Sequence, residues 1–428
     1  MQVAGVCTIG GDDIEGNKPM KRIWLINHYA MPPELEPRLR TIKFAEYLAK
    51  SGYDVTIFGA SSMHNMDMNL IAGQEDYIKK TYGVLKFVHV RAKSYSNYSE
   101  RVLNLFEFVF RMRKIASSFE KPDIIIHTAT VPFGNLMYYL AKKLKAKYFV
   151  EVLDLWPESF VMTGIMNRKN PVMPLLYFFE KWLYKRADKL IFSMQGGKDY
   201  LLEKGWDTGH GGPIDLDKVY YINNGVDLKD FNHNLTNYTI VDDDLNDEKT
   251  FKIVYIGSIR LFNNVRLLVE AAEKLKDRND IRFLIYGDGD ERKSLEEYVR
   301  SKGITNVRFK DKFIDKKYIP YLLSKSSINV LNYQQNGIWK YGGSQSKLFQ
   351  YLASGKPIVS NIVPGYCLIR QYGCGISSEF ASAEEYADAF KAIMNLSSAD
   401  YLTMCRNAKI AAENYDYEKL TNDLINLL

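Results

Sequence analysis

Residues 252–260 read KIVYIGSIR, and residues 282–290 read RFLIYGDGD. Each stretch is a short apolar run that ends in a glycine-containing turn, and residues with helical periodicity follow each one, at Val265 to Lys276 and at Asp290 to Ser301. Strands and helices that alternate in this way form a parallel sheet covered by crossover helices. The two stretches therefore predict a doubly wound α/β domain.

The same alternation continues along most of the chain. In the carboxy-terminal half it predicts further strands and helices at Val307–Phe309, Ile319–Ser324, Ile328–Leu331, Gln345–Ser354 and Pro357–Ser360. In the amino-terminal half it predicts strands and one helix at Ile23–Ile26, Leu39–Lys50, Val55–Phe58, Asp123–Ile126, Tyr148–Leu153, Lys189–Ser193 and Tyr220–Ile222. We therefore expect an α/β protein with two facing Rossmann-like doubly wound parallel-sheet domains. Such sheets bind ligands at the carboxyl ends of their strands, so a pair of them favours a two-substrate enzyme.

A change in composition separates the two domains. Residues 230–250 contain many Asn, Asp and Glu and few apolar residues, which indicates an acidic linker between residues 20–229 and residues 251–405. Residues 1–19 carry three acidic residues and one lysine and lack the features of a signal peptide, so we expect a disordered extension there. We expect residues 406–428 to form a C-terminal helix that could pack back toward the amino-terminal domain.

The composition excludes several protein classes. With 428 residues, 46% hydrophobic and 25% charged, the chain is neither collagen-like, nor a disulfide scaffold, nor fully disordered. Its four cysteines lack the close pairs of a zinc site, and its apolar runs are shorter than the about 20 residues of a membrane-spanning helix. These features indicate a cytoplasmic protein without a transmembrane anchor. The formal net charge of +6 favours phosphorylated small molecules, acidic lipid surfaces or nucleic acid as partners, but a merely soluble protein can carry it too.

Two turns at predicted strand ends could contact an anionic ligand. Gly257 and Ser258 would let the backbone approach a ligand closely, and the guanidinium of Arg260 could bind phosphate oxygens. At the next strand end, Gly287 and Asp288 could hold a base or a ribose.

Two groups of carboxylates leave a metal-dependent mechanism open. Asp288 with Asp290, or the triplet Asp242–Asp244, could hold Mn²⁺ or Mg²⁺. A turn followed by a helix cap explains the pair equally well, and the triplet lies in the predicted linker.

Residues 342–357, GGSQSKLFQYLASGKP, have the pattern of a turn followed by a short helix. The glycines and the hydroxyls of Ser344 and Ser346 lie where the helix begins, and free amides at the positive end of a helix dipole attract anions. The dipole disfavours a cation in the first turn, so an anionic ligand such as pyrophosphate would explain the position of Lys347. Gln350 lies about one turn further along the same face, where a solvated side chain is the alternative interpretation.

The stretch from Val102 to Lys114 allows two interpretations. Its leucines and phenylalanines alternate with basic residues, which suits a helix that lies on an anionic membrane. The alternative is a helix that packs in the core and keeps a basic outer rim.

Six motifs follow one another along the chain in a specific order. They are Asn27-His28-Tyr29, Asp154-Leu155-Trp156-Pro157-Glu158-Ser159, Asn224-Gly225-Val226-Asp227, Ile256-Gly257-Ser258, Gly287-Asp288-Gly289 and Ser346-Lys347-Leu348-Phe349. From about Met20 to its end, the chain resembles the retaining glycosyltransferases of family four. Within that family it is most similar to the L-fucosamine transferases of bacterial surface-polysaccharide biosynthesis. The resemblance implies the GT-B architecture of two facing Rossmann-like domains.

The resemblance also implies a function. It suggests a retaining glycosyltransferase of hexosyl or N-acetylhexosaminyl type (EC 2.4) that takes part in capsule or O-antigen synthesis. The carboxy-terminal domain would hold a nucleotide sugar, most readily a UDP-sugar, and the amino-terminal domain would hold a lipid-linked or saccharide acceptor. We expect no metal, no resident cofactor and no nucleic-acid partner. The protein would be cytoplasmic, with peripheral contact to the inner face of the plasma membrane.

Matching positions and nearby chemistry suggest the site residues. The catalytic candidates are Asp154, Arg260 and Lys347. The acceptor-binding candidates are Arg38, Arg40 and Thr128. The candidates for binding the donor nucleotide are Gly257, Ser258, Gly287, Asp288, Phe313, Ser344, Ser346 and Gln350. For Asp154, a cap of the turn at Trp156-Pro157 is the alternative role.

The chain departs from the family at several functional positions. The two glutamates that the family places eight positions apart fall on Gly342 and Gln350, so neither carboxylate is present. Gln350 could still bond a ribose hydroxyl, although a neutral amide bonds it more weakly than a carboxylate does. The basic residues that bind the diphosphate in the family fall on Ser258 and Asn263.

Other residues would have to replace the missing groups. Arg260 and Lys347 could bind the diphosphate because they are basic, although they do not stand at the positions that match the family's basic residues. The family's amino-domain histidine falls on Thr128, with His127 one position away. Because of these departures, two other functions stay open: a catalytically inactive sugar-nucleotide-binding scaffold or regulatory partner of an active transferase, and a sugar-nucleotide epimerase.

Overall fold

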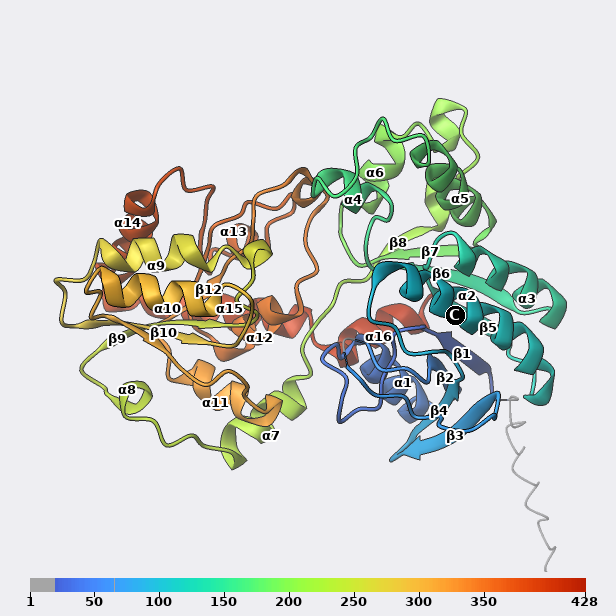
Figure 1. Cartoon of the computed structure of the whole chain (residues 1–428), viewed down its shortest axis with the longest axis horizontal. Helices are drawn as coiled ribbons and strands as arrows, with labels where there is room; N and C mark the ends of the chain where they lie inside the picture. Colours follow the sequence, from blue (N-terminus) through green and yellow to red (C-terminus); the bar gives the residue numbers. More distant parts are fainter. Residues whose placement is uncertain (1–19, 65) are drawn as a thin grey trace, which may run out of the picture.

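Two sheets, one in each half of the chain, form the framework of the protein. The computed structural model describes residues 20–64 and 66–428, and Figure 1 shows two lobes side by side, each built on one sheet. The amino-terminal sheet has the order β3-β4-β2-β1-β5-β6-β7-β8, with β3 antiparallel to β4 and the other pairs parallel. Its strands are β1 (Arg22–Ile26), β2 (Asp54–Ala60), β3 (Tyr77–Tyr82), β4 (Leu85–Val90), β5 (Ile124–Thr128), β6 (Lys147–Val152), β7 (Lys189–Phe192) and β8 (Val219–Tyr221).

The carboxy-terminal sheet is parallel throughout and has the order β11-β10-β9-β12-β13-β14. Its strands are β9 (Phe251–Ile256), β10 (Ile281–Tyr286), β11 (Val307–Phe309), β12 (Ile328–Leu331), β13 (Ile358–Ser360) and β14 (Gly375–Ser377). In both sheets the strand order reverses direction in the middle, which confirms the predicted doubly wound fold class.

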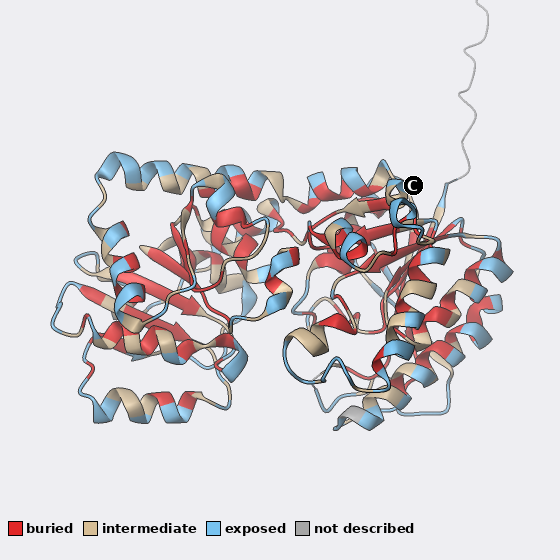
Figure 2. Cartoon of the chain, turned by 90° about the horizontal axis from the view of Figure 1, so that it is seen from above, coloured by how far each residue is buried: buried red, intermediate tan, exposed pale blue. Residues whose placement is uncertain are grey.

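Helices cover both faces of the amino-terminal sheet. One face is covered by α2 (Tyr98–Ile115), α3 (Leu136–Leu144), α5 (Met173–Arg186) and α6 (Gly197–Glu203), whose apolar side chains share one core with the sheet. The other face is covered by α1 (Arg40–Lys50) and α16 (Tyr417–Ile425). Figure 2 shows the buried sides of the helices toward the strands and the exposed sides toward solvent.

The carboxy-terminal sheet is covered in the same way. The helices α9 (Val265–Glu273), α10 (Arg292–Ser301) and α14 (Ala383–Met394) share a core with one face. The helices α11 (Ile319–Ser324), α12 (Ser346–Ser354), α13 (Leu368–Tyr372) and α15 (Ser398–Asn414) lie on the other.

The segment between the domains is structured. The predicted acidic linker contains parts of α7 (Leu228–Asn237) and α8 (Asp243–Asn246), whose side chains Phe231 and Leu245 are buried in carboxy-terminal clusters. Its acidic groups have partners in the protein, because Asp242 and Asp244 both pair with Lys310.

The chain crosses between the domains a second time near its end. Helix α15 runs to Asn414 and packs against α12 through Ala408, Ala411 and Ala412, so the carboxy-terminal domain extends past residue 405. Helix α16 then joins the amino-terminal core against α1. The predicted extension at residues 1–19 lies outside the described residues. Among the residues that the structure describes, no helix is long and apolar enough to cross a membrane.

Candidate active site

Two glycine turns meet at the carboxyl ends of β9 and β10. Gly257 has φ +154° and Gly287 has φ +128°, a backbone region that L side chains rarely adopt. A Cβ atom on Gly287 would lie 1.9 Å from the carbonyl oxygen of Gly257, so only glycine fits there. Hydrogen bonds join the turns, for example from the amide of Ile259 to the carbonyl of Asp288 at 2.9 Å. Ser258 and Asp288, two predicted donor-binding residues, are exposed on these turns.

The ammonium of Lys347 lies beside the turn at Gly257 and has no counterion among the described residues. Its Nζ atom is buried and has no hydrogen-bond partner within the described chain. It lies over the rings of Tyr255 and Tyr333, 4.8 and 5.1 Å from their centres. A Cβ atom on Gly257 would come within 2.6 Å of this Nζ. Burial lowers the pKa of Lys347 to about 8.

The start of helix α12 adds more unpartnered polar atoms. The hydroxyl of Ser344 and the side-chain amide nitrogen of Gln345 are buried without a hydrogen-bond partner. No side chain caps the helix start at Gln345, so its first amides are available to a ligand. Buried polar groups in proteins are normally paired, and three unpaired ones at one helix start are what an absent anionic ligand would leave.

The other predicted donor residues lie on α12 itself or in the loops that follow β9, β10 and β11. Ser346 is the first residue of α12, and Gln350 lies half-buried one turn later with no side-chain hydrogen bond in the described chain. Arg260 is exposed on the β9 turn and forms no ion pair with the residues described. Phe313, in the loop after β11, has 85% of its surface exposed. Asp288 and Asp290 are exposed on the β10 turn, and no group of residues able to hold a metal ion exists in residues 20–64 and 66–428.

On the amino-terminal side, Asp154 follows β6 beside two arginines. Burial of the carboxyl group raises the pKa of Asp154, and the nearby charges of Arg38 and Arg101 act in the opposite direction. Asp154 is itself an exposed residue, so its carboxylate is open to solvent; we call Asp154 with Arg38 and Arg101 the Asp154 recess. Arg38 is anchored by Glu36 and the carbonyl of Tyr29, and Arg101 donates two hydrogen bonds to the Tyr29 hydroxyl at 2.9 and 2.7 Å.

Arg40 and Thr128 meet at a different carboxylate. Arg40 is 3% exposed, and its guanidinium donates to Glu151 at 2.7 Å and to the carbonyl of Asn223 at 2.5 Å. Thr128 donates to the other oxygen of Glu151 at 3.0 Å. The charge of Arg40 is therefore compensated inside the protein. His127 is also buried, bonds the Tyr148 hydroxyl at 2.8 Å and has its pKa lowered by burial to about 3, so it stays neutral beneath the surface.

The segment before α12 is held by the amino-terminal domain. Tyr341 lies in the amino-terminal core, and its hydroxyl and the Lys340 ammonium both bond Glu203, at 2.8 and 2.5 Å. The amides of Asn223 and Asn224 donate to the carbonyls of Gly343 and Ser344 at 3.3 and 2.7 Å. The residues that lead into the anion site are thus attached to both domains.

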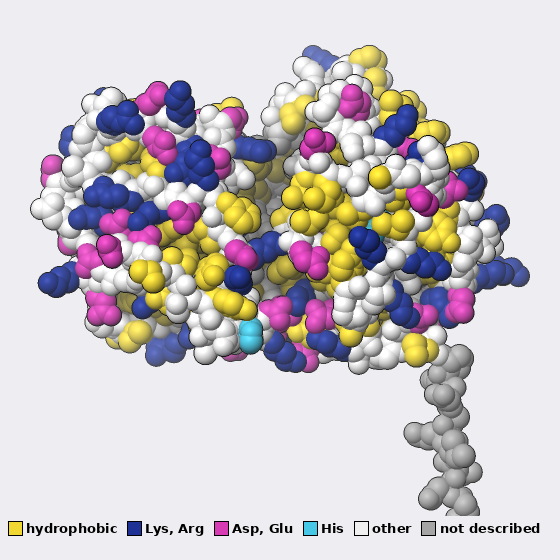
Figure 3. Space-filling view, turned by 60° about the horizontal axis from the view of Figure 1, so that its bottom comes forward, with side chains coloured by type: hydrophobic (Ala, Val, Ile, Leu, Met, Phe, Trp, Pro, Cys, Tyr) yellow, Lys and Arg dark blue, Asp and Glu magenta, His cyan; other side chains and the backbone are white. Residues whose placement is uncertain are grey.

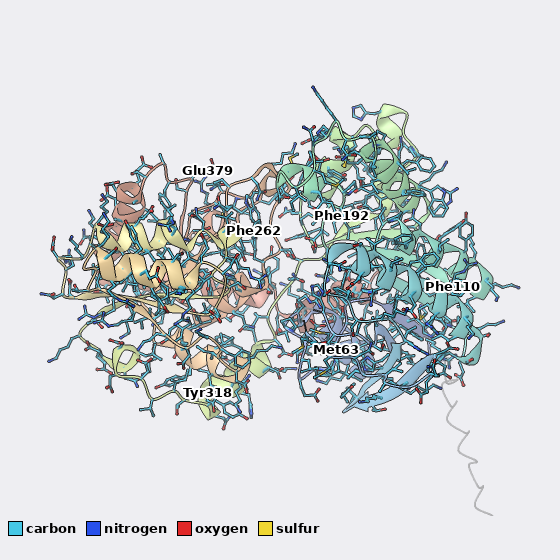
Figure 4. The ribbon with its side chains drawn as sticks, in the orientation of Figure 1. Met63, Phe110, Phe192, Phe262, Tyr318 and Glu379 are labelled. Carbon is cyan, nitrogen blue, oxygen red and sulfur yellow. The ribbon has the colours of Figure 1, made fainter. Side chains whose placement is uncertain are left out.

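Figure 3 shows a hollow between the two lobes on the face it displays. In Figure 4, Phe262, from the short 3-10 turn that follows Arg260, is labelled on the side of the carboxy-terminal lobe toward this gap. Among the predicted residues, Lys347, Ser344 and Gly257 lie together, Asp154 lies near Arg38, Arg40 and Thr128 meet at Glu151, and Ser258, Arg260, Asp288 and Phe313 are exposed on loops.

Sequence reasoning missed Arg101, Glu151 and Asn223. Arg101 lies in a stretch that reads as an amphipathic helix, and Glu151 lies inside a strand, so nothing in their local patterns marks them. Asn223 precedes a recognised motif, Asn224-Gly225-Val226-Asp227, and this was the one available signal.

Comparisons with known proteins assign glycosyltransferase domains to both halves of the chain. The family described as Glycosyltransferase Family 4 matches residues 40–230, and the family described as Glycosyl transferases group 1 matches residues 250–395. Alpha-D-kanosaminyltransferase of Streptomyces kanamyceticus is 27% identical over 147 residues, which are 33% of this chain and 36% of that enzyme. The chain thus matches about a third of the length of this curated relative.

Solved structures share the whole fold. Sucrose-phosphate synthase from Thermosynechococcus elongatus matches with a TM-score of 0.69 at 17% identity, over 95% of this chain and 98% of the other. The E. coli trehalose-6-phosphate protein bound with UDP-2-fluoro glucose matches with a TM-score of 0.69 at 11% identity, over the same 95% and 98%. Together with the family matches, these likenesses show the GT-B fold and support a glycosyltransferase.

Proposed function

We propose that this chain, whose two halves match glycosyltransferase domains, transfers a sugar from a nucleotide-sugar donor to an acceptor with retention of configuration. One observation carries the proposal: within the described residues the ammonium of Lys347 is buried without a hydrogen-bond partner or counterion, next to Gly257 and the uncapped start of α12. A buried cation without a counterion is costly, and a nucleotide diphosphate supplies the missing charge.

The same groups would serve the chemistry of the donor. In the transfer, the bond from the anomeric carbon to the diphosphate oxygen breaks, and the acceptor hydroxyl bonds to that carbon from the same face, which retains the configuration. The hydroxyl proton would pass to the carboxylate of Asp154. Negative charge then develops on the leaving diphosphate, where Lys347, Arg260 and the α12 amides would stabilise it. These cationic and amide groups would make a divalent metal unnecessary.

The acceptor would bind at the Asp154 recess. Its desolvation raises the pKa of Asp154, which makes the carboxylate a stronger proton acceptor for the attacking hydroxyl. Arg38 and Arg101 flank the recess and would bind the phosphate of a lipid-linked acceptor. In this proposal Arg40 and Thr128 act on the acceptor side indirectly, because both donate hydrogen bonds to the carboxylate of Glu151 and hold it in place.

The finer identity of the reaction rests on similarity. A UDP-sugar is supported by the E. coli neighbour, which was solved with UDP-2-fluoro glucose. The kanosaminyltransferase supports an enzyme that transfers a hexosyl or amino-hexosyl group. The surface-polysaccharide role, in capsule or O-antigen synthesis, rests on the resemblance to the L-fucosamine transferases.

One observation favours a second function. Gly342 and Gln350 stand where the family has its two glutamates, so the chain could bind a sugar nucleotide without catalysis, as a scaffold or regulatory partner.

Thermal-shift measurements with a panel of nucleotide sugars, followed by a transfer assay with the ligand that binds, test the proposal. We expect stabilisation by UDP and by one UDP-sugar, and loss of that stabilisation in Lys347→Met. Lys249→Met, which changes an exposed lysine of the same domain, is the matched control. Equal binding by Lys347→Met and the control would refute the donor site. Binding without transfer to any lipid-linked or saccharide acceptor would favour the scaffold.

A further inference from the structure

The outer surface of the amino-terminal domain exposes large hydrophobic side chains on three neighbouring helices. On α2, Leu103, Phe106 and Phe110 are 67%, 46% and 61% exposed, whereas Phe108 and Met112 on its other side are buried in the core. The buried side of α2 agrees with the core-packing interpretation of this helix, and its exposed side carries hydrophobic as well as basic residues.

The hydrophobic surface continues from α2 onto α3 and α5. On α3, Tyr139 is 50% exposed, and on α5, Leu175 and Phe178 are 53% and 58% exposed. We call this set, Leu103, Phe106, Phe110, Tyr139, Leu175 and Phe178, the aromatic face.

Contacts between the helices make the aromatic face continuous. The ring of Phe106 lies 5.5 Å from that of Phe133, just before α3, and Tyr139 lies 5.7 Å from Trp182 of α5. Asn135 donates to the carbonyl of Phe179 at 2.8 Å and so ties the start of α3 to α5. Figure 1 shows the three helices on the same lobe, and Figure 4 labels Phe110 on the side of that lobe away from the other domain.

The charges around the aromatic face are almost all positive. Arg113, Lys142, Lys143 and Lys185 are exposed on these helices. The one acidic residue of α3 and α5, Glu180, is completely buried. On α2, Glu107 is already paired with Arg111, and Glu100, in the first turn, is exposed and accepts hydrogen bonds from Ser96.

We infer that the aromatic face docks on an anionic phospholipid bilayer. Aromatic and leucine side chains among basic ones, with the exposed carboxylate of Glu100 at one end of α2, match the boundary between acyl chains and acidic headgroups. A second copy of the chain fits less well, because a two-fold contact would bring the same lysines face to face without acidic partners. The leucines would find no partner on a nucleic acid.

This docking would bring the membrane close to the Asp154 recess. Helix α2 carries Arg101 in its first turn, next to Tyr29, and Leu103, Phe106 and Phe110 follow on the next turns. The bilayer would therefore lie beside the recess in which we place a lipid-linked acceptor. The docking itself does not depend on the transfer reaction.

Vesicle sedimentation of the full chain tests the inference. Sucrose-loaded vesicles of phosphatidylglycerol and phosphatidylcholine are compared with vesicles of phosphatidylcholine alone. We expect binding to the anionic vesicles that weakens with salt, and little binding to the neutral ones. Lys142→Gln with Lys143→Gln should weaken binding roughly fivefold for each charge removed.

The triple variant Phe106→Ser, Phe110→Ser, Phe178→Ser should lose vesicle binding, while Leu402→Ser on exposed α15 of the other domain is the matched control. All six positions are outside the sites of proposed donor and acceptor binding, so UDP binding should persist in every variant and shows that the protein is folded. Unchanged vesicle binding by the triple variant, or equal binding to neutral vesicles, would overturn the inference. So would a dimer of the wild type, seen by sedimentation equilibrium, that the triple variant dissociates.

Discussion

At the scale of single residues, Lys347 combines a cost for folding with a benefit for binding. Its ammonium has a pKa near 8 in the folded protein against 10.5 when exposed, because burial removes water from the charge. Below pH 8 the group is charged in both states, and the folded state carries the full cost of burying it. A binding site that is ready for an anion is therefore a weak point of the unliganded fold.

Lys347→Met should make the unliganded protein more stable. The gain at pH 7 should reach up to about 3 kcal/mol, because a difference of one pKa unit corresponds to about 1.4 kcal/mol. The sign follows from proton binding: above pH 8 the unfolded state holds the proton more tightly, so wild-type stability rises with pH and the difference closes toward pH 10.5. Urea denaturation of both proteins between pH 6.5 and 10 measures this. A variant that is less stable than wild type at pH 7 would contradict the role of Lys347.

Gln350 is the residue at which the enzyme and the scaffold differ. In an active transferase its amide would hold a ribose hydroxyl, and the loss of that bond would cost about 1–3 kcal/mol, or roughly tenfold to a hundredfold in donor affinity. We expect Gln350→Ala to raise the donor KM accordingly and Gln350→Glu to keep or lower it, since a carboxylate is the stronger acceptor. Steady-state transfer rates of the wild type and both variants decide the matter. Activity that is indifferent to Gln350→Ala would remove the ribose role.

Individual site residues could be predicted where a local pattern explains them. Lys347 could be identified because the helix dipole disfavours a cation in the first turn of a helix, so its position indicates a ligand. In the structure its ammonium is also buried without a hydrogen-bond partner among the described residues. Arg101 and Glu151 could not be found in this way, since their partners Tyr29 and Arg40 are more than 70 residues away in the chain. The burial of Arg40 also depends on such a distant partner, so a phosphate-binding arginine and a structural one look alike in sequence.

At the scale of elements, the short turn Gly337–Tyr341 contacts both domains through its side chains. Its two aromatic residues diverge: Trp339 packs on Tyr333 in the carboxy-terminal domain, 5.3 Å between ring centres, and Tyr341 packs on Tyr200 in the amino-terminal domain, also at 5.3 Å. The segment that leads into α12, where we propose the donor diphosphate binds, begins directly after this turn. A shift between the domains would therefore move the start of α12.

Asn224→Ala should weaken the donor site although Asn224 lies on the other domain. The variant removes the hydrogen bond to the Ser344 carbonyl, worth about 1 kcal/mol, so we expect the donor KM to rise several-fold. The acceptor KM should stay constant, which separates a positioning role from general damage. Asp199→Asn is the control, because it alters another bond between the domains, to Tyr366, that does not involve the carbonyls of Gly343 and Ser344. The same donor KM in both variants would refute the coupling.

Elements could be predicted where periodicity alone decides them. The expected strands of both domains coincide closely with the observed ones, since buried parallel strands read as short apolar runs. The hairpin β3–β4 was not predicted, because β3 has exposed lysines at Lys79 and Lys80 and lies at the edge of the sheet. We expected the C-terminal residues to pack toward the amino-terminal domain, and α16 lies against α1. That α15 stays with the carboxy-terminal domain as far as Asn414 depends on its tertiary packing, which no local pattern reveals.

At the scale of the whole molecule, the chain leaves the amino-terminal domain near residue 228 and returns to it for its last helix. The amide of Val226 bonds the carbonyl of Tyr415, and the amide of Tyr417 bonds the carbonyl of Val226, so the two crossings lie against each other. Tyr417, Leu420 and Leu424 of α16 are buried in the core of the amino-terminal domain. The domain that would bind the acceptor is thus completed by residues that follow the whole donor domain in the sequence.

Tyr417→Ala should therefore destabilise one domain while sparing the other. The side chain is 1% exposed, and its ring lies 5.7 Å from that of Phe44, so its removal should cost about 3–5 kcal/mol by analogy with other large aromatic truncations. Hydrogen exchange should speed up in β1, β2 and β5 but not in β9 and β10, and UDP affinity should hold because the proposed nucleotide site lies on the other core. Leu402→Ala, on the exposed side of α15, should leave both sets of strands unchanged. If Tyr417→Ala accelerated exchange equally in both sheets, the domains would unfold as one cooperative unit, and the two crossings would have to transmit stability as well as connect the chain.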